Sequence, residues 1–405
     1  MTKNTGMYSD HIAFIRQAFQ CKEDFVPLHA PYFGGNEKQY LLETIDSTFV
    51  SSVGAYVNRF EEMMAELTGA RYAIATTNGT TALHLALVAA GIEHGDEVIT
   101  QPLTFVATAN AIAHAGGTPV FIDVDRDTAG MSPDALTAFL EQWVELKDGV
   151  PYNKSTGNRV MACVPMHTFG FPCRIDELVS ICNSYNITLI EDAAESLGSY
   201  YKDQHTGTFG VMGTFSFNGN KTVTCGGGGA VITNDSALAT RLKHLSTTAK
   251  EPHPWEFSHD AVGFNYRMPN LNAALACAQL EQLPDILANK AALANSYARY
   301  FSNTNLRFME GIPQSRPNNW LNTVILPDLE ERDQFLQETN HARVMTRPAW
   351  KLMNKLPMYT SCQHGVLSNA EWLEERLVNI PSSYRPFVER NASLSESIAT
   401  AESAE

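Results

Sequence analysis

Short apolar runs alternate with helical stretches between Ala70 and Asp192, and this alternation constrains the fold more than any other feature. Strands that alternate with helices pair in parallel, with helices on both faces of the sheet. Ligands of such sheets bind beyond the carboxyl ends of the strands, so the chemistry is expected there. Strands are predicted at Tyr72–Thr76, Glu97–Thr100, Thr118–Val124, Arg159–Pro165 and Ile187–Glu191, and helices at Thr80–Gly91, Phe105–Gly116, Ser132–Leu146 and Arg174–Asn186.

The pattern continues less regularly on both sides of this region. Further strands are predicted at Gly213–Phe217 and Gly228–Thr233, followed by helices at Ser236–Ser246 and from Asn270 to about Asn303. The predicted organisation is an N-terminal helix (1–24), a large domain (25–268), a small C-terminal domain (269–390) and a disordered tail (391–405). The strands of the small domain are expected at Arg307–Met309, Trp320–Leu326 and Arg343–Thr346.

Composition narrows the class of protein. The 405 residues are 44% hydrophobic and 18% charged, as in a globular protein, and the net charge of -15 argues against nucleic-acid binding. The seven cysteines are odd in number and form no C-x-x-C pair, which fits reduced thiols better than disulfides or a zinc site. The N-terminus lacks the apolar core of a signal peptide, and the longest apolar run, Ala82–Gly91, is too short to span a membrane. A cytoplasmic protein without a membrane partner is predicted.

A single lysine, Lys221, stands in the stretch Gly213–Ala230 (GTFSFNGNKTVTCGGGGA), in a turn between two predicted strands. A turn lysine is usually solvated. Here the neighbours are small or polar and the flanking strands are apolar enough to bury the turn, so the amine could be desolvated and form a Schiff base. The four consecutive glycines would let the backbone turn and pack closely. This stretch favours an amine kept for chemistry on a phosphate-bearing cofactor.

Three other positions at strand ends suit such a cofactor, and each has an ordinary structural alternative. Residues 77–81 (TNGTT) begin a helix where free backbone amides favour a phosphate, although a plain helix cap would look the same. Asp192 could pair with a protonated ring nitrogen or cap the next turn. Phe105 could cover a flat ring or belong to the core.

Competing motifs are absent. The Walker pattern requires glycine directly before the lysine, and this chain has Asn220 there. No G-x-G-x-x-G fingerprint and no H-E-x-x-H ligand pair occurs, which argues against a dinucleotide site and a metal enzyme. His167 could carry protons, but a hydrogen-bonded histidine at a strand end explains it as well.

Taken together and in order, the segments NGTTALHLAL, TFVATANAI, EDAAES, SFNGNK and GFNYRMPN resemble the DegT/DnrJ/EryC1/StrS family of nucleotide-sugar aminotransferases. The resemblance covers roughly Phe25 to Pro386. It implies an α/β enzyme of fold type I that depends on pyridoxal 5'-phosphate (PLP), with a mostly parallel seven-stranded sheet and a smaller α+β C-terminal domain. The form SFNGNK, with PYFGGNEKQY and FVSSVGAYV, is similar to the branch that aminates UDP-linked 4-keto-6-deoxy-N-acetyl sugars in legionaminic-acid- and bacillosamine-type pathways.

The resemblance also implies roles for the chemical groups. Lys221 would form the Schiff base with the cofactor and then move the proton between the cofactor and the sugar carbon. Asp192 would pair with the pyridinium nitrogen, which keeps the ring an electron sink. Glu195 would lie near the ring hydroxyl, where many relatives have glutamine.

The remaining contacts implied by the resemblance hold the cofactor. Phe105 would stack on its ring, and Thr80, Thr81 and Ser216 would bind its phosphate. Asn265 would reach the phosphate of a partner subunit, which predicts a homodimer with shared active sites.

The predicted reaction is the transfer of an amino group from glutamate to a UDP-linked keto sugar. Arg267 is a candidate for holding the diphosphate. One alternative is a PLP-dependent dehydratase, but in those relatives histidine replaces the Schiff-base lysine. The other is a sensor of sugar nucleotides, which would not need Lys221, Asp192 and Phe105 together.

Overall fold

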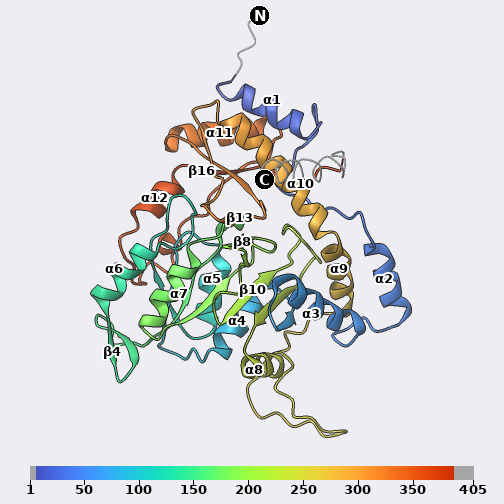
Figure 1. The fold of residues 1–405 in the computed structure, drawn as a ribbon, viewed down its shortest axis with the longest axis vertical. Helices are drawn as coiled ribbons and strands as arrows, with labels where there is room; N and C mark the ends of the chain where they lie inside the picture. The colour runs from blue at the N-terminus through green and yellow to red at the C-terminus, as the bar shows by residue number, and fades with distance from the viewer. Residues whose placement is uncertain (1–5, 387–405) are drawn as a thin grey trace, which may run out of the picture.

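A seven-stranded sheet forms the centre of the computed structural model, which describes residues 6–386 (Figure 1). Strand β11 (Gly229–Thr233) pairs antiparallel with both of its neighbours, and all other neighbours in the sheet pair in parallel. The predicted α/β class with a mostly parallel sheet is therefore confirmed. The strands, in spatial order, are β1 (Tyr72–Thr76), β11 (Gly229–Thr233), β10 (Met212–Ser216), β7 (Thr188–Asp192), β6 (Val160–Val164), β2 (Glu97–Thr100) and β3 (Thr118–Phe121).

Helices cover both faces of this sheet because successive strand residues point to opposite sides. In β11, Ala230 and Ile232 pack in one apolar cluster, whereas Val231 between them packs in another. Helices α3 (Ala55–Thr68), α6 (Pro133–Trp143), α7 (Ile175–Ser184) and α9 (Asn270–Glu281) cover one face, and helices α4 (Gly79–Ala89), α5 (Val106–His114) and α8 (Ser236–Ser246) cover the other. The result is a three-layer arrangement whose strands are buried on both sides.

A second, four-stranded sheet lies in the C-terminal part of the chain, in agreement with the predicted α+β character of that part. Its order is β12 (Arg307–Phe308), β14 (Asn322–Ile325), β16 (Leu377–Ile380) and β15 (Arg347–Pro348). Helices α10 (Leu283–Phe301), α11 (Leu329–His341) and α12 (Ser368–Glu374) accompany it. The N-terminal helix α1 (Ser9–Ala18) packs here as well, with Ile15 in one core with Leu293 and Phe335 (Figure 1). The domain boundaries at residues 24, 268 and 390 stay predictions, and the predicted tail (391–405) lies outside the described residues.

Several predicted elements differ from the structure. The long helix is two helices, because α9 ends before Gln282 and Pro284 stands in the first turn of α10, where its missing N–H is tolerated. The strand predicted at Arg343–Thr346 is wrong: Val344 forms a single bridge with Val26, and the sheet strand is β15.

A hairpin was missed where the helix Ser132–Leu146 was predicted. Helix α6 ends at Trp143, and β4 (Val144–Lys147) pairs with β5 (Val150–Asn153). The two residues between them, Asp148 and Gly149, have φ of 52° and 80°, as the tight turns of such hairpins require. The Asp-Gly pair was therefore the signal for a hairpin. Shorter elements are α2 (Glu37–Asp46), β8 (Tyr200–Tyr201), β9 (Gln204–His205) and β13 (Ser315–Arg316).

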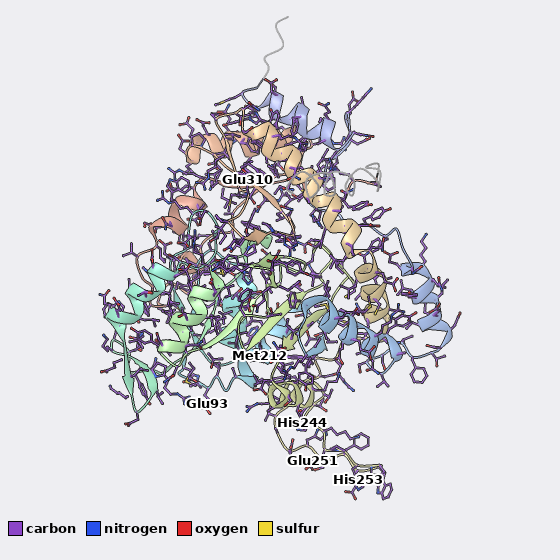
Figure 2. All side chains as sticks on the ribbon, viewed as in Figure 1. Glu93, Met212, His244, Glu251, His253 and Glu310 are labelled. Carbon is purple, nitrogen blue, oxygen red and sulfur yellow. The ribbon has the colours of Figure 1, made fainter. Side chains whose placement is uncertain are left out.

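The chain between α8 and α9 forms a loop that projects from the body of the molecule. Figure 2 shows Glu251 and His253 near its far end. Trp255 and Phe257 in this loop are largely exposed. The described residues contain no helix that is long and apolar enough to cross a bilayer. They also contain no group of three or more His, Cys, Asp or Glu side chains placed to hold a metal ion.

Candidate active site

A cavity of about 650 Å³ opens at the carboxyl ends of the parallel strands, where ligands of such sheets bind. Five of the seven strands bring a part of its wall. Asp192 is the last residue of β7 and Ser216 the last of β10, whereas Asn78, Phe105 and Met166 follow β1, β2 and β6. The cavity thus gathers residues that lie far apart in the sequence.

Lys221 reaches this cavity from the loop between β10 and β11. The backbone N–H of Lys221 donates to the carbonyl of Asn218 at 3.0 Å, which closes the predicted turn. Its Nζ lies 3.1 Å from Oε1 of Glu195 and 4.1 Å from the centroid of the Trp320 ring. The side chain is 13% exposed, so the amine is neither solvated nor sealed in the core.

Glu195 is the partner of this amine and is almost fully buried. Its Oε2 accepts a hydrogen bond from the backbone N–H of Phe169 at 2.8 Å. Burial raises the pKa of Glu195 to about 7, although the nearby charge of Lys221 opposes the shift. A carboxyl group with that pKa can hold or release a proton at neutral pH.

Asp192 is also buried, with 5% exposed. Its Oδ2 accepts from the Thr108 hydroxyl at 2.7 Å and its Oδ1 from the backbone N–H of Ala194 at 3.2 Å. Burial raises the pKa of this carboxyl group. Within residues 6–386, no Lys, Arg or His forms an ion pair with Asp192, and a buried carboxylate without a cation is costly. A cationic group of a ligand in the cavity would supply the missing partner.

The N-terminus of α4 forms a second wall. Thr81 completes a capping box with Asn78, because its hydroxyl bonds the backbone of Asn78 and its N–H donates to Oδ1 of Asn78 at 2.9 Å. The Thr81 hydroxyl is therefore already used. Thr80 and Ser216 line the cavity beside the free N–H groups of the first helical turn, which favour an anion.

Close approach at this wall depends on glycines. A Cβ at Gly79 would lie 2.7 Å from Cβ of Ser216, so only glycine lets α4 come this near to the end of β10. A Cβ at Gly229 would lie 2.3 Å from the carbonyl oxygen of Asn78, across the β1–β11 pair. Gly226 has a φ of 78°, which favours glycine. The glycines after Lys221 thus have the turning and packing role that the sequence predicted.

Aromatic side chains form the remaining wall. Phe105 is 48% exposed and its ring centroid lies 6.1 Å from that of Trp350. Trp320 and Trp350 were not predicted, because they come from the C-terminal part of the chain and carry no local signal. Thr108 was also missed, but it lies three residues after Phe105 and hence on the same face of α5.

Two predicted contacts lie outside this cavity. Asn265 is exposed at the base of the projecting loop, where its backbone forms an isolated β-bridge with Thr247. Its Oδ1 accepts from the guanidinium of Arg267 at 3.3 Å. Neither Asn265 nor Arg267 lines the cavity of its own chain. A role for Asn265 in a partner's site stays a prediction.

His167 does not line the cavity and is fully buried. Its Nε2 lies 2.9 Å from Oε2 of Glu191, and its Nδ1 accepts from the backbone N–H of Cys173 at 3.3 Å. Oε2 of Glu191 accepts from the backbone N–H of Gly207 as well. Both ring nitrogens are occupied, so the geometry supports the structural reading of His167.

Known structures share this fold. The aminotransferase TlmJ from Streptoalloteichus hindustanus superposes with a TM-score of 0.81 at 24% identity, covering 94% of this chain and all (100%) of that chain. PseC, an aminotransferase from Helicobacter pylori involved in pseudoaminic acid biosynthesis, gives a TM-score of 0.80 at 23% identity, covering 94% and 98%. Spr1654 from Streptococcus pneumoniae in its PLP form gives 0.79 at 20% identity, covering 94% and 98%. The fold is that of the PLP-dependent aminotransferases of fold type I.

The sequence identifies the group within that class. The chain belongs to the DegT/DnrJ/EryC1/StrS aminotransferase family, whose profile matches residues 31–390. The GDP-perosamine synthase of Escherichia coli O157:H7 is 37% identical over 360 residues, covering 88% of this chain and 93% of the relative. The GDP-perosamine synthase of Caulobacter vibrioides is 35% identical over 361 residues, covering 88% and 93%. The protein is therefore a transaminase with PLP as its cofactor.

Proposed function

We propose that this transaminase moves an amino group from glutamate to the 4-keto carbon of a nucleotide-linked 4-keto-6-deoxy sugar. The observation that carries the proposal is the position of Lys221, whose Nζ lies in the cavity 3.1 Å from Glu195. The buried carboxylate of Asp192 faces the same cavity, and no described Lys, Arg or His forms an ion pair with it. An amine with a proton acceptor beside it suits proton transfer at a carbon next to a nitrogen.

The lining residues suit PLP in charge and shape. Thr80, Ser216 and the first backbone N–H groups of α4 would hold the phosphate, with the Thr81 hydroxyl fixing the helix cap. Asp192 would pair with the ring nitrogen, and Phe105 would cover the ring face. Bound there, PLP supplies an electron sink that makes the amino group transferable.

Lys221 and Glu195 would then carry the protons. The amine of Lys221 would hold the cofactor between turnovers and, once released, remove and return the proton at the substrate carbon. Glu195 would share that proton, since its pKa of about 7 lets it hold or release one near neutral pH. The backbone N–H of Phe169 fixes the other carboxylate oxygen, which keeps Oε1 aimed at Nζ.

Two carriers for the sugar are supported by different observations. The segments SFNGNK and PYFGGNEKQY resemble the branch that uses UDP-linked N-acetyl sugars. The two relatives compared above are named GDP-perosamine synthases, which favours a GDP-linked sugar. We propose the UDP-linked N-acetyl sugar, in bacterial surface-glycan synthesis of the legionaminic-acid or bacillosamine type, with the GDP-linked sugar as the second candidate.

An assay with a panel of substrates tests this proposal. The purified protein is incubated with glutamate and with UDP- and GDP-linked 4-keto-6-deoxy sugars, and the aminated product is assigned by NMR. Amination of the UDP-linked N-acetyl sugar in preference to the GDP-linked sugar is expected. Preference for the GDP-linked sugar would favour the second candidate instead. If neither sugar is aminated, both candidates are rejected.

We further propose that the protein is cytoplasmic and forms a homodimer with shared active sites. Asn265 and Arg267 support the sharing, because they lie outside the cavity of their own chain and could reach that of a partner. Mixing an inactive Lys221→Ala chain with an inactive Asn265→Ala chain should then restore part of the activity. In a shared arrangement, each mixed dimer contains one site with both native residues. Absence of any rescue after verified subunit exchange would contradict sharing.

A further inference from the structure

Trp320 contacts the reactive lysine in two ways. Its ring centroid lies 4.1 Å from Nζ of Lys221, and its Nε1 donates to the carbonyl of Asn220 at 2.7 Å. The indole is almost fully buried, with 3% exposed. The face of an indole attracts a cation because its π electrons carry negative charge. Trp320 therefore touches both the ammonium of Lys221 and the peptide bond that precedes this residue.

Asn318 holds the other side of the lysine. Its Nδ2 donates to the carbonyl of Glu195 at 2.8 Å and lies 3.5 Å from the hydroxyl of Thr222. Its Oδ1 accepts from the backbone N–H of Trp320 at 2.9 Å. Asn318 and Trp320 thus hold the residues before and after Lys221, together with the backbone of its carboxylate partner.

This arrangement requires a close approach of distant segments. A Cβ at Gly170, which has a φ of 95°, would lie 2.0 Å from Oδ1 of Asn318. Only glycine therefore leaves room for the Asn318 side chain to reach its partners. Residues from the C-terminal part of the chain are built into the site with little freedom to shift.

The two partners of Nζ differ in how they hold it. A carboxylate such as Glu195 binds an ammonium through directed hydrogen bonds. A ring face binds it without a fixed direction, so the amine can leave and return by rotation of its own side chain. A second carboxylate in place of Trp320 would bind the amine more tightly. Once the amine had moved away, this carboxylate would remain as a buried charge without a partner.

We propose that Trp320 is a positioning residue for Lys221. Its indole face receives the ammonium whenever the lysine is not bonded to the cofactor, and its N–H fixes the Asn220 carbonyl so that Nζ stays beside Glu195. This inference rests on the proposed function in that it assumes a lysine that is alternately bonded and free.

The test measures how fast Lys221 is acylated in the full-length protein. Excess glutamate is added first, which under the proposed function frees the lysine, and mass spectrometry then follows the Lys221 peptide with exposed Lys38 as the internal reference. In Trp320→Leu the ammonium loses its ring partner, so acylation near pH 7 should become about tenfold faster. At about pH 11 most lysines are uncharged, and the rates of variant and wild type should agree.

The pH pattern separates positioning from mere loosening. If the substitution only opens the site, Lys221 is acylated faster by the same factor at both pH values, and that result would overturn the proposal. Unchanged acylation rates at both pH values would overturn it as well. Trp320→Phe keeps a ring but loses the N–H and should give about a threefold increase near pH 7. If Trp320→Leu does not fold, Trp320→Phe decides by the same criterion.

Trp372→Phe serves as the matched control, because Trp372 also lies against a cation, with its ring centroid 4.4 Å from the Arg126 guanidinium, but outside the cavity. Its Lys221 rate should equal that of the wild type. Failure of the proposed function would appear separately, as wild-type protein that aminates no sugar. The acylation assay contains glutamate and no sugar, so its rates test Trp320 whichever sugar is aminated.

Discussion

Two lysines contact Trp320, one at its ring and one at its backbone carbonyl, and their surroundings differ. Lys221 faces the cavity and has a carboxylate and a ring face as partners. Lys290, on α10, is 1% exposed, and its Nζ donates to the carbonyls of Trp320 at 3.2 Å and Ser382 at 2.6 Å. No carboxylate pairs with Lys290 within residues 6–386, and burial lowers its pKa to about 7.

The difference shows what makes a buried lysine available for chemistry. Two backbone carbonyls hold Lys290 in one position, so its amine links α10 to the segments around Trp320 and Ser382. The amine of Lys221 has a hydrogen-bond partner, Glu195, and a ring face, that of Trp320, and it lies next to a cavity. When this amine moves, Glu195 is the buried acceptor that loses its donor, and Glu195 can then take up a proton. The partners of each amine and the cavity beside Lys221 therefore distinguish the reactive amine from the structural one.

The largest expected effect comes from Lys221→Ala. We expect a yellow wild-type protein, and in the variant a loss of the covalent chromophore and a fall in kcat of about 10⁴-fold or more, because the nucleophile and proton carrier is removed. Absorbance spectra and the amination assay measure the two effects. An active Lys221→Ala enzyme would contradict the reactive role of Lys221, since the cavity lysine would then be no more important for catalysis than Lys290.

A smaller effect, on stability, is expected from Lys290→Ala. The substitution leaves two buried carbonyls without donors and opens a void, so the free energy of unfolding should fall by about 3 kcal/mol. Urea denaturation measures the change, and Lys38→Ala on the exposed face of α2 should stay within about 0.5 kcal/mol of the wild type. A stable Lys290→Ala variant that has lost its chromophore would reverse the roles assigned to the two lysines.

Glu195→Gln should produce the smallest change, and it depends on pH. The folded pKa of Glu195, about 7, lies above its ordinary value of 4.5. The carboxyl group therefore contributes stability that is fully present below pH 4.5 and lost as the pH rises through 7. Between pH 5 and 8 the wild type should lose about 2 kcal/mol relative to Glu195→Gln, as measured by unfolding at each pH. If the free energies of unfolding of the two proteins change in parallel between pH 5 and 8, Glu195 is ionised over that whole range. It would then be a fixed partner of its lysine, like the carbonyls around Lys290.

The sequence predicted the parts of the site that follow strands. Asp192 and Ser216 end strands, whereas Phe105 lies just before, and Thr80 within, the first turn of the helix that follows a strand. Parallel pairing brings such strand ends to one edge of the sheet. The sheet itself was predictable for the same reason, because its strands are short apolar runs between helices.

Residues that reach the site from other parts of the fold were not predictable. Trp320 is 100 positions from Asn220, its hydrogen-bond partner, and only the packing of the C-terminal part brings the two together. The exposure of Asn265 likewise follows from how its loop is placed in the fold rather than from its residue type. A local pattern cannot encode these contacts, since their energy comes from tertiary packing.

The position of α1 has a consequence for synthesis of the chain. The apolar partners of Ile15 include Phe335 on α11 and Ile380 on β16, which are translated long after α1. The large sheet has all of its strands once Thr233 has been made. Helix α1 therefore lacks these partners until more than three hundred further residues have been translated, as the interval from Ile15 to Phe335 requires. Translation order thus gives chaperones a long interval in which to bind the apolar face of α1.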